Sequence, residues 1–214
     1  MKQFDNYIFD LDGTLLSTLG DLTTSTNYAM RAFNMPEHSI DEVRKFVGNG
    51  IRKLIERAIP QGIENPQYEQ VYNVFMEHYL KHSLDTTKPY DGIMDMLKTL
   101  KGNGKRMAIV SNKYCTATEE LCQHFFNEYI NVAIGESERI KKKPAPDTVI
   151  EAMERLGITR ENTVYVGDSE VDIATARNSG IPCISVLWGF REKDFLIENG
   201  GKTFIEHPRQ LTEW

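Results

Sequence analysis

Two aspartates stand two positions apart at the end of a short apolar run. They are Asp10 and Asp12, in the segment DLDGT at residues 10–14, and the residues before them read YIF, which is typical of a buried strand. Neighbouring carboxylates repel each other, so a site that keeps both ionised needs a cation nearby. Enzymes also use such pairs in catalysis, with one carboxylate acting as a nucleophile and the other as a proton donor.

Further polar residues follow other apolar runs along the chain. In order, the residues at predicted strand ends are Asp10 and Asp12, Ser111 and Asn112, Lys143, and Asp168. Ligands of open parallel sheets bind beyond the carboxyl ends of the strands, so we expect these groups to share one crevice. Three acids together need a cation, and their hard oxygen atoms suit Mg²⁺. A calcium loop is rejected because its sixth position, which must be glycine, is Leu15.

Five short apolar runs predict the strands, at residues 7–10, 106–111, 131–135, 163–168 and 182–189. They are mostly continuous rather than alternating, as in a parallel sheet covered on both faces. Helical patterns lie between them, so the predicted class is α/β with a mostly parallel central sheet. Two helical segments end at Gly157 and Gly180, and a third predicts a capping box of Thr116 and Glu119.

One region interrupts this alternation. Residues 18–84 contain helical patterns alone, one of which starts with a Ser39/Glu42 capping box. The sequence therefore predicts a discontinuous Rossmann-like core of residues 1–16 and 86–214. A helical cap domain of residues 17–85 is inserted into that core.

The overall composition restricts the partners. The 214 residues carry a formal net charge of −6, which argues against a general nucleic-acid binder. No apolar stretch approaches the roughly 20 residues that span a bilayer, and the N-terminal segment lacks the long apolar run of a secretory signal. We expect a cytoplasmic protein without membrane or nucleic-acid partners, and either a monomer or a homodimer.

As a set, these motifs resemble the haloacid dehalogenase-like (HAD) superfamily, and closely its phosphoglycolate-phosphatase-like members with a helical C1-type cap. The resemblance rests on DLDGT, on the Ser111–Asn112 step of VSNK, on Lys143 in KKPAPD, and on GDSEVD with Asp168 and Asp172. It implies a Mg²⁺-dependent phosphatase that hydrolyses a small phosphorylated metabolite, a phosphoglycolate-type phosphomonoester, through an aspartyl-phosphate intermediate.

The resemblance also implies residue roles. The catalytic residues are Asp10 as nucleophile, Asp12 as general acid and base, and Lys143. Asp10, Asp168 and the backbone carbonyl of Asp12 would hold the metal. The residues that would bind the phosphate and the rest of the substrate are Leu11, Ser111, Asn112, Lys143, Gly50 and Arg52. The supporting residues are Thr14, Ser169 and Asp172, although Asp172 is also placed to interact with a helix N-terminus.

Several functions stay open on these residues. A phosphomutase, a pyrophosphatase or a nucleotidase would share the core set, and a non-catalytic phosphate-binding protein could keep the fold. A dehalogenase has no leaving alkoxide to protonate, so Asp12 argues against it. The family pattern of Asp-Ser shortly after the first motif is replaced here by Ser17 and Thr18, which leaves the substrate open. Arg52 could face a carboxylate or a second phosphate, or be a surface arginine.

Overall fold

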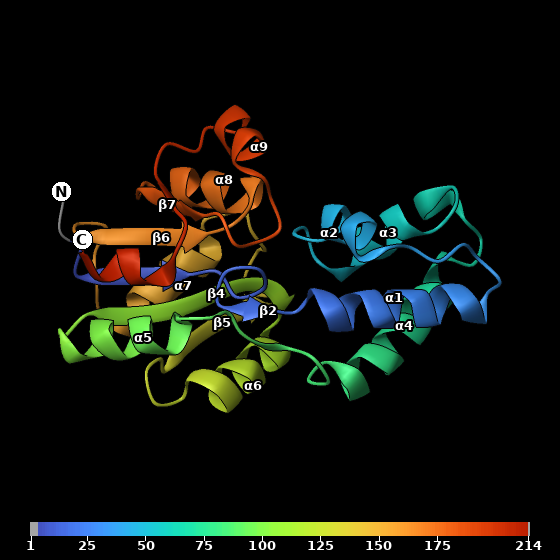
Figure 1. The fold of residues 1–214 in the computed structure, drawn as a ribbon, viewed down its shortest axis with the longest axis horizontal. Coiled ribbons are helices and arrows are strands. Elements are labelled where there is room, and N and C mark those ends of the chain that lie inside the picture. Colours follow the sequence, from blue (N-terminus) through green and yellow to red (C-terminus); the bar gives the residue numbers. More distant parts are fainter. Residues whose placement is uncertain (1–3, 214) are drawn as a thin grey trace. The chain divides into compact units, whose positions relative to one another are not determined.

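The computed structural model describes residues 4–213, which form two compact units (Figure 1). The core unit runs to Leu16 and resumes at Pro89, and the helical unit comprises Ser17–Lys88. Where the chain passes between them, β2 (Leu16–Ser17) pairs with β3 (Lys88–Pro89). Among the described helices, none has both the length and the apolar character needed to span a membrane.

The core unit is built on a six-stranded parallel sheet in the order β5-β4-β1-β6-β7-β8. Its strands are β1 (Asn6–Phe9), β4 (Arg106–Tyr114), β5 (Val132–Glu136), β6 (Thr163–Gly167), β7 (Cys183–Val186) and β8 (Phe204–Ile205). Strand β1 pairs with β4 on one side and β6 on the other, so the later strands diverge to both sides of it. Such a reversal of strand order is where doubly wound sheets bind ligands. The predicted α/β class is confirmed.

Helices cover both faces of this sheet (Figure 1). They are α5 (Ile93–Gly102), α6 (Cys115–Phe126), α7 (Asp147–Leu156), α8 (Glu170–Ser179) and α9 (Lys193–Glu198), with a 3₁₀ helix η2 (Pro208–Glu213). Tyr7 and Phe9 pack into a core cluster with residues of α5 and α6, whereas Ile8 packs with residues of α7 and α8. Both faces of β1 are therefore buried, which explains why its sequence is a continuous apolar run.

The helix ends test the predicted caps. Helices α7 and α8 end at Gly157 and Gly180, which adopt left-handed φ values of 63° and 72°, as predicted. The capping box at Thr116 is wrong. Strand β4 continues past Ser111 to Tyr114 and α6 begins directly at Cys115, so Thr116 lies inside the helix.

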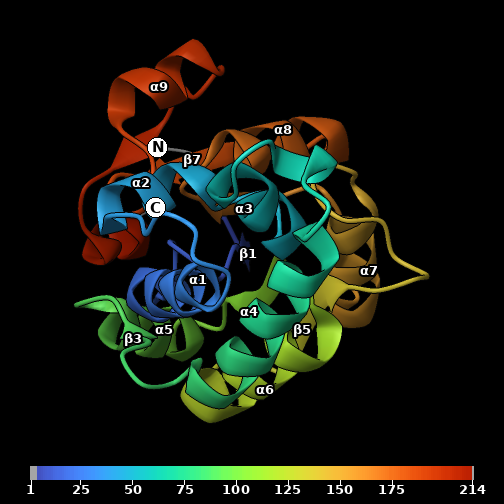
Figure 2. The same cartoon turned by 90° about the vertical axis from the view of Figure 1, so that its right-hand side faces the viewer.

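The helical unit contains α1 (Leu19–Ala32), α2 (Ile40–Phe46), α3 (Ile51–Ala58), η1 (Gly62–Glu64) and α4 (Tyr68–His82), seen from a second side in Figure 2. The predicted capping box of Ser39 and Glu42 starts α2. Asp21 is buried, and its carboxylate accepts hydrogen bonds from the backbone N–H and hydroxyl groups of Thr86 and Thr87. This acid ties the first helix to the segment by which the chain leaves the unit.

Candidate active site

The site begins in the turn that follows β1. The Asp10 N–H donates to the Val166 carbonyl at 2.9 Å, and the Leu11 carbonyl accepts the N–H groups of Thr14, Leu15 and Leu16. Gly13 has a φ of 91°, and a Cβ at this position would lie 2.6 Å from Asp168 Oδ2. Glycine therefore allows both the left-handed turn and its close approach to the Asp168 carboxylate.

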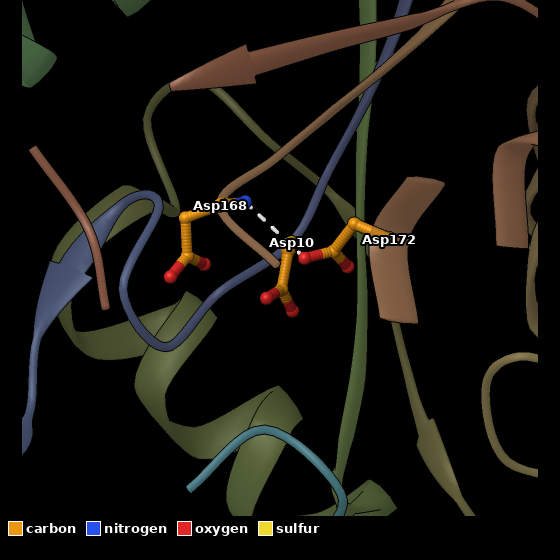
Figure 3. A group of neighbouring side chains, drawn as sticks. All are labelled: Asp10, Asp168 and Asp172. Carbon is orange, nitrogen blue, oxygen red and sulfur yellow. Dashed lines mark hydrogen bonds between the residues drawn. The ribbon is translucent and has the colours of Figure 1, made fainter. Parts of the chain in front are cut away.

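Three carboxylates meet at the carboxyl end of the sheet (Figure 3). Asp10 follows β1, Asp168 follows β6, and Asp172 lies in the first turn of α8. All three are buried, and one ligand oxygen from each lies within 4.8 Å of the others. Figure 3 shows the three side chains from different elements gathered in one region. Because like charges this close repel, the arrangement needs compensating positive charge.

Lys143 supplies part of that charge. Its Nζ lies 2.7 Å from Asp10 Oδ1, 2.8 Å from Asp172 Oδ1 and 3.1 Å from the Tyr165 hydroxyl. These contacts match the three donors of an ammonium group. Asn112 holds the lysine backbone, because its Nδ2 donates to the Lys143 carbonyl at 3.1 Å and its Oδ1 accepts from the Lys143 N–H at 2.7 Å. The Asn112 side chain, predicted at the phosphate, thus anchors the Lys143 loop.

Asp172 is the most heavily hydrogen-bonded acid of the three. Its Oδ1 accepts from Lys143 Nζ and the Tyr165 hydroxyl, at 2.8 and 2.9 Å. Its Oδ2 accepts from the Asp168 N–H, shown dashed in Figure 3, and from the N–H and hydroxyl of Ser169. The carboxylate therefore positions the lysine and caps α8 at once, which combines the two alternatives left open by the sequence. Both oxygens are occupied, so Asp172 is the poorest metal ligand of the trio.

Asp168 is held by two contacts from distant parts of the chain. Thr14 Oγ1 donates to its Oδ1 at 3.0 Å, and the Phe190 N–H donates to its Oδ2 at 2.7 Å. Each oxygen keeps a further lone pair. Asp10 is less occupied still, since its Oδ2 accepts no hydrogen bond from the described residues. Asp10 and Asp168 are therefore the two side chains best able to bind a metal.

The electrostatics favour a cation at this place. Burial, and then the charge of Asp172, raise the pKa of Asp168 to about 7. The same two causes raise the pKa of Asp10 well above its usual range, against the opposing pull of Lys143. Burial also works against ionising Asp172, but Lys143 and the hydrogen bonds hold its pKa below the usual value. A divalent cation between Asp10 and Asp168 would relieve this excess of negative charge, and their oxygens are donors that fit it.

Asp12 lies on the same turn with a different environment. Its Oδ2 is 3.4 Å from Lys113 Nζ, and the two side chains are 20% and 5% exposed. Its Oδ1 is buried and has no hydrogen-bond partner among the described residues. A buried carboxylate oxygen without a donor is costly, so this atom is placed to receive a proton or a donor from a bound molecule.

The turn motif, the strand-end residues and the parallel sheet point to one family, and the sequence model of the haloacid dehalogenase-like hydrolases matches residues 7–186. The chain belongs to the haloacid dehalogenase-like hydrolases. The family predicted from the motifs is confirmed, and so is the enzyme class, a phosphatase-like hydrolase.

Among curated relatives of this hydrolase, Phosphoglycolate phosphatase 1 of Pseudomonas aeruginosa is 33% identical over 211 residues, covering 95% of this chain and 77% of that protein. The N-acetylmuramic acid 6-phosphate phosphatase of the same species is 28% identical, covering 96% and 92%. A crystal structure of a provisionally assigned phosphoglycolate phosphatase from Lactobacillus delbrueckii subsp. bulgaricus superposes with a TM-score of 0.95 and is 34% identical, covering 99% and 98% of the two chains.

The structure adds site residues of this hydrolase that the sequence did not reveal. Lys113 is buried beside Asp12, and its N–H donates to Ser111 Oγ at 3.1 Å. Tyr165 joins Lys143 to Asp172 from the middle of β6. The Phe190 contact to Asp168 comes from a backbone N–H, which has no sequence signature. The sequence did contain a signal for Lys113, because VSNK places it directly after two polar residues at a predicted strand end.

The predicted substrate residues of the helical unit have local partners. Gly50 precedes α3 with a φ of 86°. Arg52 pairs with Glu69 at 2.8 Å, and its guanidinium lies 4.3 Å from the centre of the Tyr72 ring. The Arg52 side chain is 52% exposed, and such surface pairs contribute little to stability. The helical unit thus presents Arg52 as an exposed cation that can exchange its partner at low cost.

Proposed function

We propose that this hydrolase is a Mg²⁺-dependent phosphatase that hydrolyses a small phosphomonoester through an aspartyl-phosphate on Asp10. The observation that carries the proposal is the division of labour between two carboxylates on one turn. Asp10 accepts a hydrogen bond from Lys143 at Oδ1, and its Oδ2 accepts none from the described residues. Asp12, in contrast, has a buried Oδ1 without a hydrogen-bond donor among these residues. One acid is placed to attack and the other to exchange a proton.

In the first step, a lone pair of Asp10 Oδ2 forms a bond to phosphorus, and the bond from phosphorus to the ester oxygen breaks. Asp12 donates its proton to that oxygen, so the alcohol leaves neutral. Lys143 keeps the Asp10 carboxylate oriented through the 2.7 Å contact to Oδ1. Asp172 and Tyr165 in turn hold the lysine.

In the second step, the Asp12 carboxylate takes a proton from water, and the water oxygen attacks phosphorus. The bond from Asp10 to phosphorus breaks, which releases inorganic phosphate and restores the Asp10 carboxylate. Asp12 is protonated again and ready for the next cycle. Asp12 thus serves as the acid in the first step and as the base in the second.

Asp10, Asp168 and the Asp12 carbonyl are the proposed metal ligands. A Mg²⁺ bound there would neutralise the phosphoryl oxygens and bring them close to Asp10. The raised pKa of both carboxyl groups supports this assignment, because each carries negative charge that Lys143 alone does not balance. The phosphate itself would contact Ser111, the backbone after Asp10 at Leu11, Asn112 and Lys143.

For the helical unit we propose the role of a cap, with Gly50 and Arg52 as substrate-binding residues. Arg52 would exchange Glu69 for an anionic group of the substrate. An Arg52→Met variant should then raise KM with little change in kcat, because the residue does not touch the reacting atoms. A Glu69→Gln variant removes the competing carboxylate and should not raise KM.

The proposed function is tested by phosphate release from a panel of esters with Mg²⁺ and with excess chelator. The panel holds 2-phosphoglycolate, N-acetylmuramic acid 6-phosphate, sugar phosphates, nucleoside monophosphates and pyrophosphate. Metal-dependent release that peaks on one monoester supports the proposal. Release that persists in chelator would remove the metal from it, and no release from any compound would overturn it.

A further inference from the structure

Two histidines lie one turn apart on α4, at His78 and His82. Helix α4 packs beside α1 in the helical unit (Figure 2). The two imidazole rings are stacked, with centroids 4.3 Å apart and planes inclined by 25°. The ring of Tyr28, from α1, also stacks on His78, with centroids 4.1 Å apart. This stacking of three rings from two helices restricts the orientation of both imidazoles.

Each imidazole is also held through its Nδ1 atom. His82 Nδ1 lies 2.8 Å from Asp85 Oδ2, and His78 Nδ1 lies 3.0 Å from the hydroxyl oxygen of the buried Ser25. A carboxylate only accepts hydrogen bonds, so His82 Nδ1 carries the proton and Nε2 keeps a lone pair. The Ser25 hydroxyl can accept from His78 in the same way. Histidines that bind metals usually donate their other ring N–H to such an oxygen, which fixes the tautomer.

The Nε2 atoms remain available. Within residues 4–213, neither His78 Nε2 nor His82 Nε2 makes a hydrogen bond. The side chain of His82 is 44% exposed, so the pair borders solvent. Two zinc–nitrogen bonds of about 2.0–2.1 Å together span roughly the separation of the two rings. One ion can therefore bridge the two imidazoles after small rotations of the side chains.

The charges around the pair do not oppose a cation. Two cations that act on His78, Arg31 and Lys81, are each paired with a glutamate, whereas Asp85 adds a negative charge. Burial, and then the charge of His82, lower the pKa of His78 below its usual value. An imidazole must be neutral to bind a metal, so these surroundings favour binding at neutral pH.

From this arrangement we propose that His78 and His82 form a site for a divalent transition-metal ion of the class that imidazole binds, Zn²⁺, Ni²⁺ or Cu²⁺. The two Nε2 atoms would be its ligands, with water completing the coordination. Tyr79 stands where a zinc-protease motif has glutamate, so we assign binding and no reaction. The site lies wholly within the helical unit, and the inference does not depend on the proposed function.

The test measures Zn²⁺ binding by calorimetry near pH 7, with excess Mg²⁺ present to occupy carboxylate sites. The native protein is compared with His78→Ala and His82→Ala. In case alanine disturbs the stack, His78→Phe and His82→Phe keep an aromatic ring but lack a ligand atom. The matched control is His124→Ala on α6, an exposed histidine with no other histidine three or four positions away.

The native protein should bind one Zn²⁺ ion that every replacement of His78 or His82 weakens by at least about tenfold. Losses of that size are typical even for the hydrogen-bonded partners of metal ligands. His124→Ala should bind Zn²⁺ as the native protein does, and binding should weaken at pH 5, where imidazoles are protonated. With Cu²⁺ as the probe, electron paramagnetic resonance should show splitting from two nitrogen ligands, which the carboxylates of the core unit cannot produce.

Three results would overturn the inference. The native protein could bind no more Zn²⁺ than the variants of His78 and His82. Binding could depend on only one of the two histidines, which would mean that a single imidazole acts alone. An equal loss in His124→Ala would show general binding to surface histidines. None of these readouts uses phosphate release, so this inference and the proposed function fail separately.

Discussion

Lys143 and Asp10 form a buried ion pair, with Nζ 2.7 Å from Oδ1 and side chains 3% and 10% exposed. The pair joins the loop after β5 to the turn after β1, across 133 positions of sequence. Asp172 shares the same ammonium at 2.8 Å. The proposed nucleophile is thus held by a cation that is itself fixed by a second acid. The geometry of the attack therefore depends on Asp172, which is not among the proposed substrate contacts.

Replacing Asp172 should be costly for stability. In Asp172→Ala, Lys143 loses one of its two carboxylates, and the Ser169 and Tyr165 donors lose their acceptor. Breaking a buried pair in this way typically costs about 3–5 kcal/mol. Urea unfolding should show that loss, whereas Glu151→Ala, which breaks an exposed pair with Arg155, should cost under about 1 kcal/mol. Equal effects of the two substitutions would contradict the positioning role.

Asp168 should make the metal-free protein sensitive to pH. Its folded pKa of about 7 lies above the ordinary 3.8, so between these values the folded state holds a proton that the unfolded state has released. This group therefore lowers the free energy of unfolding as the pH rises through that window. Asp168→Asn cannot ionise, so in chelator it should melt increasingly above the native protein between pH 5 and pH 8.

The gap should reach several degrees, since about 1 kcal/mol shifts the melting temperature of a protein of this size by roughly 2–4 °C. Added Mg²⁺ should raise the melting temperature of the native protein at pH 8 and that of Asp168→Asn much less. A melting difference that stays constant with pH, or an equal response of the two proteins to Mg²⁺, would count against the assigned charge and metal role.

Asp12→Ala should separate the two halves of the reaction. An alkyl phosphate needs its leaving oxygen protonated, so its turnover should fall by about 10²–10⁴-fold per affected step. The nitrophenolate of p-nitrophenyl phosphate leaves without a proton, so its first step should survive while hydrolysis of the intermediate slows. Stopped-flow absorbance should then show a burst of about one nitrophenolate per enzyme. A uniform loss without a burst would argue against Asp12 as the acid and base.

The sequence predicted the sheet and the location of the site for a physical reason. Buried parallel strands must be apolar throughout, so the point where YIF gives way to Asp10 marks both the end of β1 and the start of the turn. The same rule located Asp168 after β6, and the structure brings these two carboxylates together with Lys143. Position at the end of a strand is a local property, so a single sequence is enough to predict it.

The missed residues depend on non-local properties. Tyr165 lies inside an apolar strand, and only the packing of β6 against α8 shows that its hydroxyl meets Asp172. Burial of Lys113 depends on β4 continuing to Tyr114, three positions beyond the predicted end at Ser111. For Asn112 the sequence predicted a phosphate contact, but it did not reveal the contact of its side chain with the Lys143 backbone, which needs β4 and the loop after β5 to meet. Such partners cannot be deduced from spacing along one chain.

The central claim is that Asp10 carries the phosphoryl group, and it is tested most directly by trapping that adduct. Asp12→Ala, mixed with Mg²⁺ and p-nitrophenyl phosphate and quenched in acid, should yield a peptide containing Asp10 that has gained one phosphoryl group by mass spectrometry. The Asp10→Asn/Asp12→Ala double variant should yield none and should keep its fold. Turnover by the native enzyme with no adduct on Asp10 at any quench time, or an adduct on another residue, would contradict the account.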